Sequence, residues 1–320
     1  MHLEIKTSWI FKILKPFLFL ILFFSPLNFK ADDTQYFRIY KLFNRGDYGR
    51  KNFEKEVKLL TQAIKEEPRY FPYYSLLSKI YRIQGETGKA IELWSKLLSL
   101  NPPRKWKIIA TQHLSALKER KKFKVKVSEE GFLDLVEVYN CQGITRDNVR
   151  YVNDFSLTPQ GITFEEKHLP NILACPRNVR IKFQLPCLPY IDKREDLDFF
   201  LTAIKCRGQE LEIEPSQIYR SLHILGFSVS GDKEEGVITL IYTDESQKIE
   251  VEFSDWINRE PSHEPVYRDS EKHFCNGEEI SDLQKPLWMF HYSILLKEKI
   301  LKKIVLPKKR GVRIIALTLK

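Results

Sequence analysis

Asp255 and Trp256 are adjacent residues whose types suit the binding of a sugar. A sugar presents both apolar C–H faces and hydroxyl groups, so its site needs an exposed aromatic ring beside a carboxylate or an amide. The strand-like run with Trp288, His291 and Tyr292 offers similar residue types. The alternative in both places is structural: the rings would fill a hydrophobic core, and Asp255 would fix a turn.

No group of His, Cys, Asp or Glu has the spacing of a known metal or catalytic site. His263, His273 and Cys275 lie near one another in sequence, but zinc needs three or four convergent ligands and this spacing is not a recognised one. Acidic pairs such as Asp196 and Asp198 are typical of surface loops. Phosphate-binding loops, dinucleotide fingerprints and hydrolase motifs are absent from the sequence. We therefore predict no catalytic residue, no metal, no cofactor and no enzymatic activity.

The five cysteines all belong to the second half of the chain: Cys141, Cys175, Cys187, Cys206 and Cys275. An odd number leaves at least one thiol unpaired, and no two have the CxxC spacing of a redox or zinc site. Disulfide pairing in an oxidising compartment and burial as small apolar residues are the two alternatives for the others.

Residues 34–120 are predicted to form helices that position the basic residues of this part of the chain. Glycine is scarce there, and apolar residues such as Leu60 and Ile64 recur at helical spacing. Pro68 and Pro102 lie 34 residues apart, and each follows a helical stretch that it ends.

This 34-residue period resembles the tetratricopeptide repeat, in which small residues let two helices cross and aromatic residues fill the space between neighbours. Residues 71–104 carry the pattern at Tyr74, Leu77, Ser78, Tyr81, Ala90, Trp94 and Pro102. Residues 37–70 carry a weaker copy, and residues 104–120 are expected to form a capping helix. Because solenoid repeats are stabilised by their neighbours, we expect so short a module to rest on the second domain or on a partner.

The resemblance implies that the first helix of each repeat lines a concave face. In this register the face is formed by Arg38, Lys41, Arg45, Ser75, Lys79 and Arg82, five of which are basic. A row of cations would bind an acidic peptide of a partner protein through charge-assisted hydrogen bonds. The alternatives are an ordinary solvated helix face and contact with an anionic membrane surface.

The net charge of +10 is distributed unevenly. Residues 34–125 carry 21 Lys and Arg against 8 Asp and Glu, whereas residues 126–320 carry 27 against 31. The basic surplus therefore belongs to the helical part alone. A nucleic-acid site would need aromatic rings exposed among these cations, but Tyr74, Tyr81 and Trp94 are needed for helix packing. We therefore expect no nucleic-acid partner.

Beyond a basic linker at 118–131 the pattern changes to short alternating runs, as in residues 179–185 and 248–253. Many short strands without helices between them predict an all-β sandwich over residues 132–320. Further strands are expected at 132–138, 219–225, 236–243, 287–296, 300–306 and 312–319.

Short phrases in this half, taken in order, resemble the galactose-binding-like jelly-roll domains found beside bacterial glycosidases. They lie at 139–140, 143–144, 161–164, 169–170, 222–226, 241–244, 253–256, 304–307 and 314–319. The resemblance implies a non-catalytic module that binds a sugar or packs against a neighbouring protein.

Residues 1–31 are predicted to be a signal peptide or an N-terminal anchor. Lys6, Lys12 and Lys15 come before an apolar run, and polar residues follow it. About 12 apolar residues are too few to span a bilayer core of roughly 30 Å, and this pattern is typical of a secretory signal peptide. A retained anchor would use residues 9–27.

The sequence thus predicts an α + β multidomain protein, with a short helical tetratricopeptide-type solenoid at 34–120 and an all-β jelly-roll sandwich at 132–320. We expect an exported, non-catalytic binding or scaffolding protein of the bacterial cell envelope, whose helices bind a protein and whose sandwich docks to a protein or a glycan. The alternative is a glycan-active envelope enzyme or its carbohydrate-binding accessory. Two carboxylates in a pocket beside Trp256 would favour the enzyme.

Overall fold

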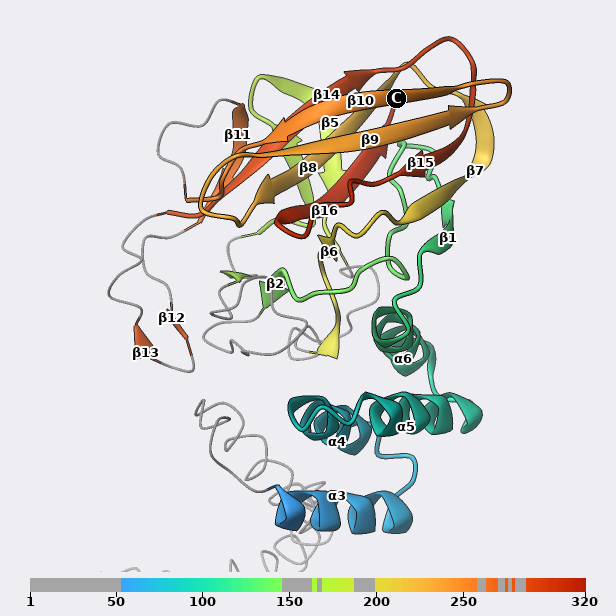
Figure 1. Cartoon of the computed structure of the whole chain (residues 1–320), viewed down its shortest axis with the longest axis vertical. Helices are drawn as coiled ribbons and strands as arrows, with labels where there is room; N and C mark the ends of the chain where they lie inside the picture. Colours follow the sequence, from blue (N-terminus) through green and yellow to red (C-terminus); the bar gives the residue numbers. More distant parts are fainter. Residues whose placement is uncertain are drawn as a thin grey trace, which may run out of the picture. The chain divides into compact units, whose positions relative to one another are not determined.

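Four helices followed by a β-sandwich make up the described part of the chain (Figure 1). The computed structural model describes residues 53–145, 163–165, 169–186, 199–257, 263–269, 274–275, 278–279 and 286–320. All of them belong to one compact unit, Lys41–Lys320. The predicted signal peptide and the first helix of the predicted first repeat lie outside the described residues.

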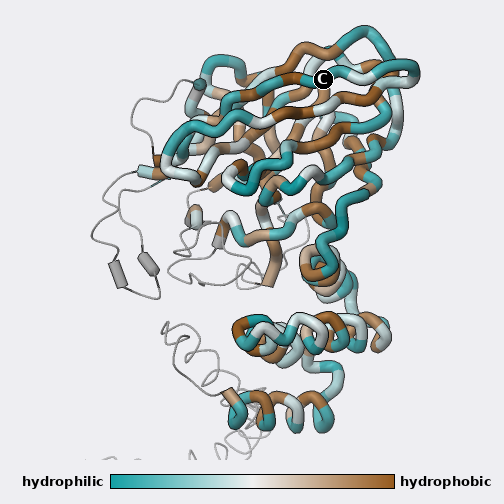
Figure 2. The backbone as a smooth tube through the Cα atoms, in the orientation of Figure 1, coloured by the Kyte–Doolittle hydropathy of each residue, from teal (hydrophilic) through white to brown (hydrophobic). Residues whose placement is uncertain are grey.

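The helices are α3 (Glu54–Glu66), α4 (Pro72–Ile83), α5 (Thr87–Ser99) and α6 (Arg104–Leu117). Pro72 begins α4, where its missing N–H costs nothing, and Pro103 comes directly before α6. Gly85 has a φ of +75°, which glycine adopts readily, in the short turn between α4 and α5. Figure 2 shows hydrophobic and hydrophilic residues alternating around α3, whose Leu60 and Ile64 are buried. The helical character predicted for this part of the chain is confirmed.

Aromatic side chains fill the space between the helices. Tyr74 and Trp94 are fully buried, as is Ala90, and Ser78 is nearly so. The Tyr74 hydroxyl donates a hydrogen bond of 3.0 Å to the carbonyl oxygen of Pro68, and the Trp94 ring stacks on His113 of α6. The small residues and the rings thus share one interior, which is what the spacing predicted.

The sandwich has two five-stranded sheets. Sheet 1 has the order β1 (Lys122–Lys126), β7 (Glu210–Ile218), β15 (Ile300–Val305), β9 (Glu234–Tyr242) and β10 (Ser246–Phe253). Sheet 2 has the order β11 (Glu264–Arg268), β14 (Trp288–Leu295), β8 (Ser221–Ser228), β16 (Val312–Leu319) and β6 (Ile204–Lys205). Shorter pairs are β2 (Ile144–Thr145) with β3 (Phe164–Glu165), β4 (Ile172–Cys175) with β5 (Asn178–Gln184), and β12 (Phe274–Cys275) with β13 (Glu278–Glu279).

The central strands of sheet 2, β8 and β16, are covered on both faces, whereas sheet 1 keeps one face in solvent. Every residue of β16 is buried, and so is all of β8 after its first residue. The β4–β5 hairpin covers the face of sheet 2 that is turned away from sheet 1: Thr318 donates a 2.7 Å hydrogen bond to the carbonyl oxygen of Lys182, and the rings of Phe183 and His291 are 5.8 Å apart. A strand buried on both faces has no polar alternation. This explains the continuous apolar run at the end of the sequence.

Two expectations about this half are wrong. Residues 132–138 do not form a strand, because the Asp134 carboxylate accepts a hydrogen bond from the Val136 N–H and the chain then turns. The predicted linker 118–131 contains strand β1, which pairs in parallel with β7. Its buried Phe123 and Val125 alternate with exposed lysines, so the edge strand has the composition of a basic linker.

Helix α6 is joined to the sandwich through Gln112, whose side chain is fully buried. The Gln112 amide donates hydrogen bonds of 2.7 Å and 3.1 Å to the carbonyl oxygens of Val136 and Leu201, and it accepts one of 3.1 Å from the Leu201 N–H. His113 bonds the Phe199 carbonyl oxygen at 3.0 Å, and the ring of Trp106 contacts that of Phe199. We call these contacts the Gln112 lock.

His113 predicts a pH-dependent stability. Burial, reinforced by the charge of Arg82, lowers the pKa of His113 to about 3. An unfolded histidine titrates near a pKa of about 6.5, so between these values the unfolded chain binds a proton that the folded chain excludes. Stability from this group is therefore complete above about pH 6.5 and falls as the pH is lowered toward 3.

The change His113→Gln keeps a donor for the Phe199 carbonyl oxygen but removes the titration. Urea unfolding at pH 7 and pH 5 should show a smaller pH-induced loss in the variant, by on the order of 2 kcal/mol. The other histidines titrate in both proteins and cancel in this comparison. An equal loss in both proteins would contradict the assignment.

Candidate functional site

Asp255 and Trp256, the predicted glycan residues, are buried at 4% and 2% exposure. The Trp256 ring stacks on Phe227, with centroids 5.6 Å apart and planes 7° apart, and Phe164 meets it edge-on. The two carboxylate oxygens of Asp255 accept hydrogen bonds from the N–H groups of Gly231 and Ile257. A sugar platform needs an open ring face, so this burial argues against the predicted site and favours the structural alternative of a core ring beside a turn-fixing carboxylate.

The predicted basic face is only partly within the described residues. Arg38, Lys41 and Arg45 lie outside them. Of the other two cations, Lys79 is half-buried and Arg82 is buried. Both are close enough to His113 of α6 for their charges to lower its pKa. The Arg82 side chain is therefore part of the helix packing, which argues against its predicted place in an open groove.

Three cysteines, Cys141, Cys175 and Cys206, are buried and free of disulfides. Burial raises the pKa values of Cys141 and Cys206, so neither is a thiolate at neutral pH. Their burial agrees with the alternative of small apolar core residues. Cys187 lies outside the described residues.

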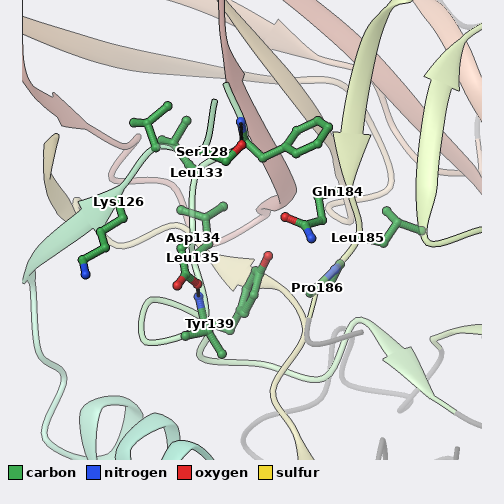
Figure 3. A pocket seen from close by; sticks show the side chains of 12 residues that line it. Lys126, Ser128, Leu133, Asp134, Leu135, Tyr139, Gln184, Leu185 and Pro186 are labelled. Carbon is green, nitrogen blue, oxygen red and sulfur yellow. Dashed lines mark hydrogen bonds between the residues drawn. The ribbon is translucent and has the colours of Figure 1, made fainter. Parts of the chain in front are cut away.

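One cavity, of about 390 Å³, lies between residues 126–139 and the end of β5. We call it the junction cavity. Figure 3 shows Asp134, Tyr139 and Gln184 around the same space, with the Leu185 side chain on the other side of the strand. The Tyr139 hydroxyl donates to the Ile315 carbonyl oxygen, and the Asp134 carboxylate accepts a hydrogen bond from the Val136 N–H. The lining also includes the polar residues Lys126, Ser128 and Gln184.

A second cavity, of about 510 Å³, lies along the edges of the two sheets, between β10 and β14. We call it the edge groove. It is lined by Gln247, Ile249, Glu250, Val251, Glu252, His263, His291, Tyr292, Ser293, Ile294 and Leu295. The alternation of β10 turns Gln247, Ile249 and Val251 toward the interior and leaves Lys248 and Glu250 in solvent.

Polar contacts close one end of the edge groove. The Ser254 N–H donates a 2.8 Å hydrogen bond to the Tyr292 hydroxyl, and the Ser254 hydroxyl bonds His263 at 2.9 Å. Burial lowers the pKa of His263 and raises that of Tyr292, so both are neutral at pH 7. These groups hold the two sheets together at this end.

His291 belongs to a second polar chain. His223 bonds His291 at 3.0 Å and the Ser221 hydroxyl at 2.9 Å. Burial, followed by the charge of His291, lowers the pKa of His223 to about 4. The residue types of His291 and Tyr292 single them out in the sequence, whereas nothing in the sequence singles out His223 and Ser254, because their contacts depend on which strands pair and on how the sheets pack.

The two cavities do not provide the carboxylate pair beside Trp256 that would have favoured an enzyme. Asp134 is the one carboxylate lining the junction cavity. The edge groove has Glu250 and Glu252, and Glu252 pairs with Lys233 at 2.8 Å. Within the described residues, no three His, Cys, Asp or Glu side chains are placed to hold a metal ion. No helix among them is long and apolar enough to cross a membrane, and residues 9–27 lie outside this search.

Replacing Trp256 distinguishes a core ring from a binding platform. Trp256→Ala should lower the free energy of unfolding by about 3–5 kcal/mol, since it removes a buried ring from a packed interior. The half-buried Trp288 of β14 is a suitable control, and Trp288→Ala should cost less than half as much. Urea unfolding measures both. If Trp256→Ala lowers the free energy of unfolding by no more than the control does, Trp256 is an exposed binding platform rather than a core ring.

A sequence model described as the AziU2-like beta-sandwich domain matches residues 130–320, which is more than half of the chain. These are the residues that form nearly all of the two sheets. No curated protein matches the chain. The chain therefore belongs to the family of proteins with an AziU2-like β-sandwich domain.

Proposed function

We propose that the chain is an exported, non-catalytic binding or scaffolding protein, in which the helices hold a partner protein and the sandwich docks to a second protein or a glycan. The observation that carries this proposal is the Gln112 lock. It makes the helices and the sandwich one body, so that ligands bound to the two parts would be held in a fixed relation.

The chemistry of the lock supports a rigid scaffold. A flexible linker would be enough to tether two independent modules, and linkers leave domain orientation free. Here a fully buried amide bonds three backbone groups of the sandwich, from Val136 and Leu201. A buried amide is stable only while its partners stay in place, because an unmade bond there costs about 1–3 kcal/mol.

The helices are proposed to be a tetratricopeptide-type module. The burial of Ser78 and Ala90, and of the rings of Tyr74 and Trp94, supports this assignment. So does the contact of α6 with the sandwich through Trp106, because a short solenoid needs a neighbour to cover its last helix.

The proposed helical ligand is an acidic peptide segment of a partner protein. This proposal is supported by the charge of residues 34–125, which include 21 basic and 8 acidic residues. With Arg82 buried, the predicted face depends on Arg38, Lys41, Arg45 and the half-buried Lys79. An anionic membrane surface is the alternative ligand for the same charges.

Export to the cell envelope is proposed from residues 1–31, whose basic flank and short apolar run are typical of a signal peptide. We also propose that the AziU2-like β-sandwich has a galactose-binding-like, jelly-roll character.

The junction cavity favours a second candidate function, that of a carbohydrate-binding accessory. Its lining combines the Asp134 carboxylate and the Gln184 amide with apolar side chains such as Phe132 and Leu133, and such a combination suits a sugar.

Charge reversal tests the helical ligand. The variant Arg38→Glu/Lys41→Glu/Arg45→Glu should weaken binding of a glutamate-rich peptide by at least about tenfold at low salt, since the cations would attract its carboxylates. The control Lys58→Glu/Lys65→Glu/Lys96→Glu makes the same charge change at exposed positions of α3 and α5. Fluorescence anisotropy measures binding of the labelled peptide to the full chain.

The control should keep most of the affinity, and wild-type binding should weaken in about 0.5 M NaCl. Equal losses in the two variants would show that the peptide senses overall charge rather than a groove. Absence of binding in the wild-type protein would reject the acidic ligand.

A further inference from the structure

Two open strand edges border the edge groove (Figure 1). Strand β10 ends the order of sheet 1, and no described strand pairs with its outer side. Strand β14 pairs with β8 from Phe290 to Leu295, whereas β11 covers its other side only from Trp288 to His291. Residues 292–295 therefore have no described strand on that side. Unpaired edges are where extended segments of other chains add to a sheet.

The groove is formed before any ligand arrives. At one end Ser254, Tyr292 and His263 bridge the sheets. At the other end two lysines of the loop after β14 bind the turn between β9 and β10: Lys297 meets Glu245 at 2.6 Å, and Lys299 meets Asp244 at 2.8 Å. A segment could enter without separating the sheets, so little binding energy would be spent on rearrangement.

The groove interior suits an extended backbone with apolar side chains. Ile249, Val251 and Ile294 provide apolar surface, and Leu295 is 82% exposed beside them. The Gln247 side-chain oxygen is buried and accepts no hydrogen bond from any described residue. Such an acceptor costs free energy until a donor reaches it, and a backbone N–H of an added strand is a suitable donor.

The charge of the groove defines its ligand. Among the side chains that line it, the carboxylates of Glu250 and Glu252 are present and no lysine or arginine is. Glu252 is engaged by Lys233, and Lys248 lies on the same solvent face of β10 as Glu250. Glu250 is therefore the carboxylate placed to meet an incoming cation, which must lie opposite Glu250 rather than Lys248. In a strand, alternate side chains face opposite ways. A segment with basic residues on one face and apolar residues on the other can therefore meet Glu250 with one face and the apolar interior with the other.

We propose that the edge groove binds an extended segment of a partner protein that alternates basic and apolar residues, and that this segment adds to β10 as a sixth strand of sheet 1. From Gln247 to Glu252 the groove spans about 17 Å, at about 3.3 Å for each residue, which is room for about six residues of the ligand. This inference rests on the proposed binding function of the sandwich and names the ligand for it.

A labelled octapeptide of alternating lysine and valine is the probe, and the full chain is the receptor. The peptide should bind saturably at low salt. A peptide of alternating glutamate and valine should bind at least about tenfold more weakly because it meets Glu250 with like charge. A lysine–valine peptide with two central prolines should also lose binding, since proline cannot donate to a strand ladder.

Two groove variants, each with a matched control, test whether the peptide binds in the edge groove. Glu250→Lys should weaken the lysine–valine peptide by about tenfold, whereas Glu212→Lys, an equal charge change at an exposed position of β7, should change binding by less than about twofold. Leu295→Ser should weaken binding too, whereas Val179→Ser, at an exposed position of β5, should not. All four positions are exposed, so the variants should fold.

Hydrogen exchange provides the structural readout. Saturation with the lysine–valine peptide should slow exchange of the β10 amides while β1 exchanges as before. The proposal is overturned if the peptide does not bind, if Glu250→Lys and Glu212→Lys weaken it equally, or if protection appears elsewhere. Protection of β10 that grows with protein concentration in the absence of peptide would also overturn it, because the ligand would then be a second copy of the chain.

The same preparations can be tested with the glutamate-rich peptide at the helices. Loss of that binding with the edge groove still active would reject the acidic helical ligand alone. Loss of lysine–valine binding with the helices still active would reject the edge-groove ligand alone.

Discussion

The buried amide of Gln112 is the contact on which the described structure depends, because it joins helices and sandwich into one body. Its three hydrogen bonds reach backbone groups at Val136 and Leu201, which lie far apart in the sequence. These bonds fix α6 against the sandwich, and α6 in turn packs on α5 through His113 and Trp94. The proposed function relies on this order of contacts, since a scaffold must hold its two binding surfaces in a constant relation.

The two sheets of the sandwich differ in how far they are exposed to solvent. The central strands β8 and β16 of sheet 2 are buried on both faces and serve mainly as a core, in which Phe227 of β8 stacks on Trp256. Sheet 1 keeps a solvent face on which lysines and glutamates pair, as Lys303 and Glu210 do at 2.8 Å. Binding surfaces are then expected at edges rather than on faces, and the edge groove lies where both sheets end. The two proposed ligands have opposite charge, in line with the opposite net charges of the two parts of the chain.

The sequence was a good guide wherever local pattern decides structure. The spacing of Tyr74, Ala90 and Trp94 predicted that these residues are buried between helices. The alternation in residues 248–253 predicted a strand with one solvent-exposed face. It failed where a local hydrogen bond competes with the pattern, as at Asp134, which turns a chain that reads as a strand. It also failed at β1, because the exposed lysines of this edge strand give it the composition of a basic linker.

The candidate site was harder to predict, because it depends on contacts between distant residues. Trp256 and Asp255 have the composition of a sugar site, but the partners that bury them come from other parts of the chain. The edge groove has no sequence motif: Gln247, His263 and Leu295 line one groove only because β10 and β14 are neighbouring edges. Which residues meet across two sheets is set by strand order, and that order could not be read from the spacing of residues.

Hydrogen exchange of α6 in Gln112→Ala tests the central claim most directly, with Thr111→Ala on the same helix as the control. Removing the amide breaks three buried hydrogen bonds, so the opening free energy of α6 should fall by about 3 kcal/mol or more. The control removes only a hydroxyl that bonds within the helix, and it should change the value by less than about 0.5 kcal/mol. If α6 opens equally easily in both variants and in the wild-type protein, the helices and the sandwich are not joined as described.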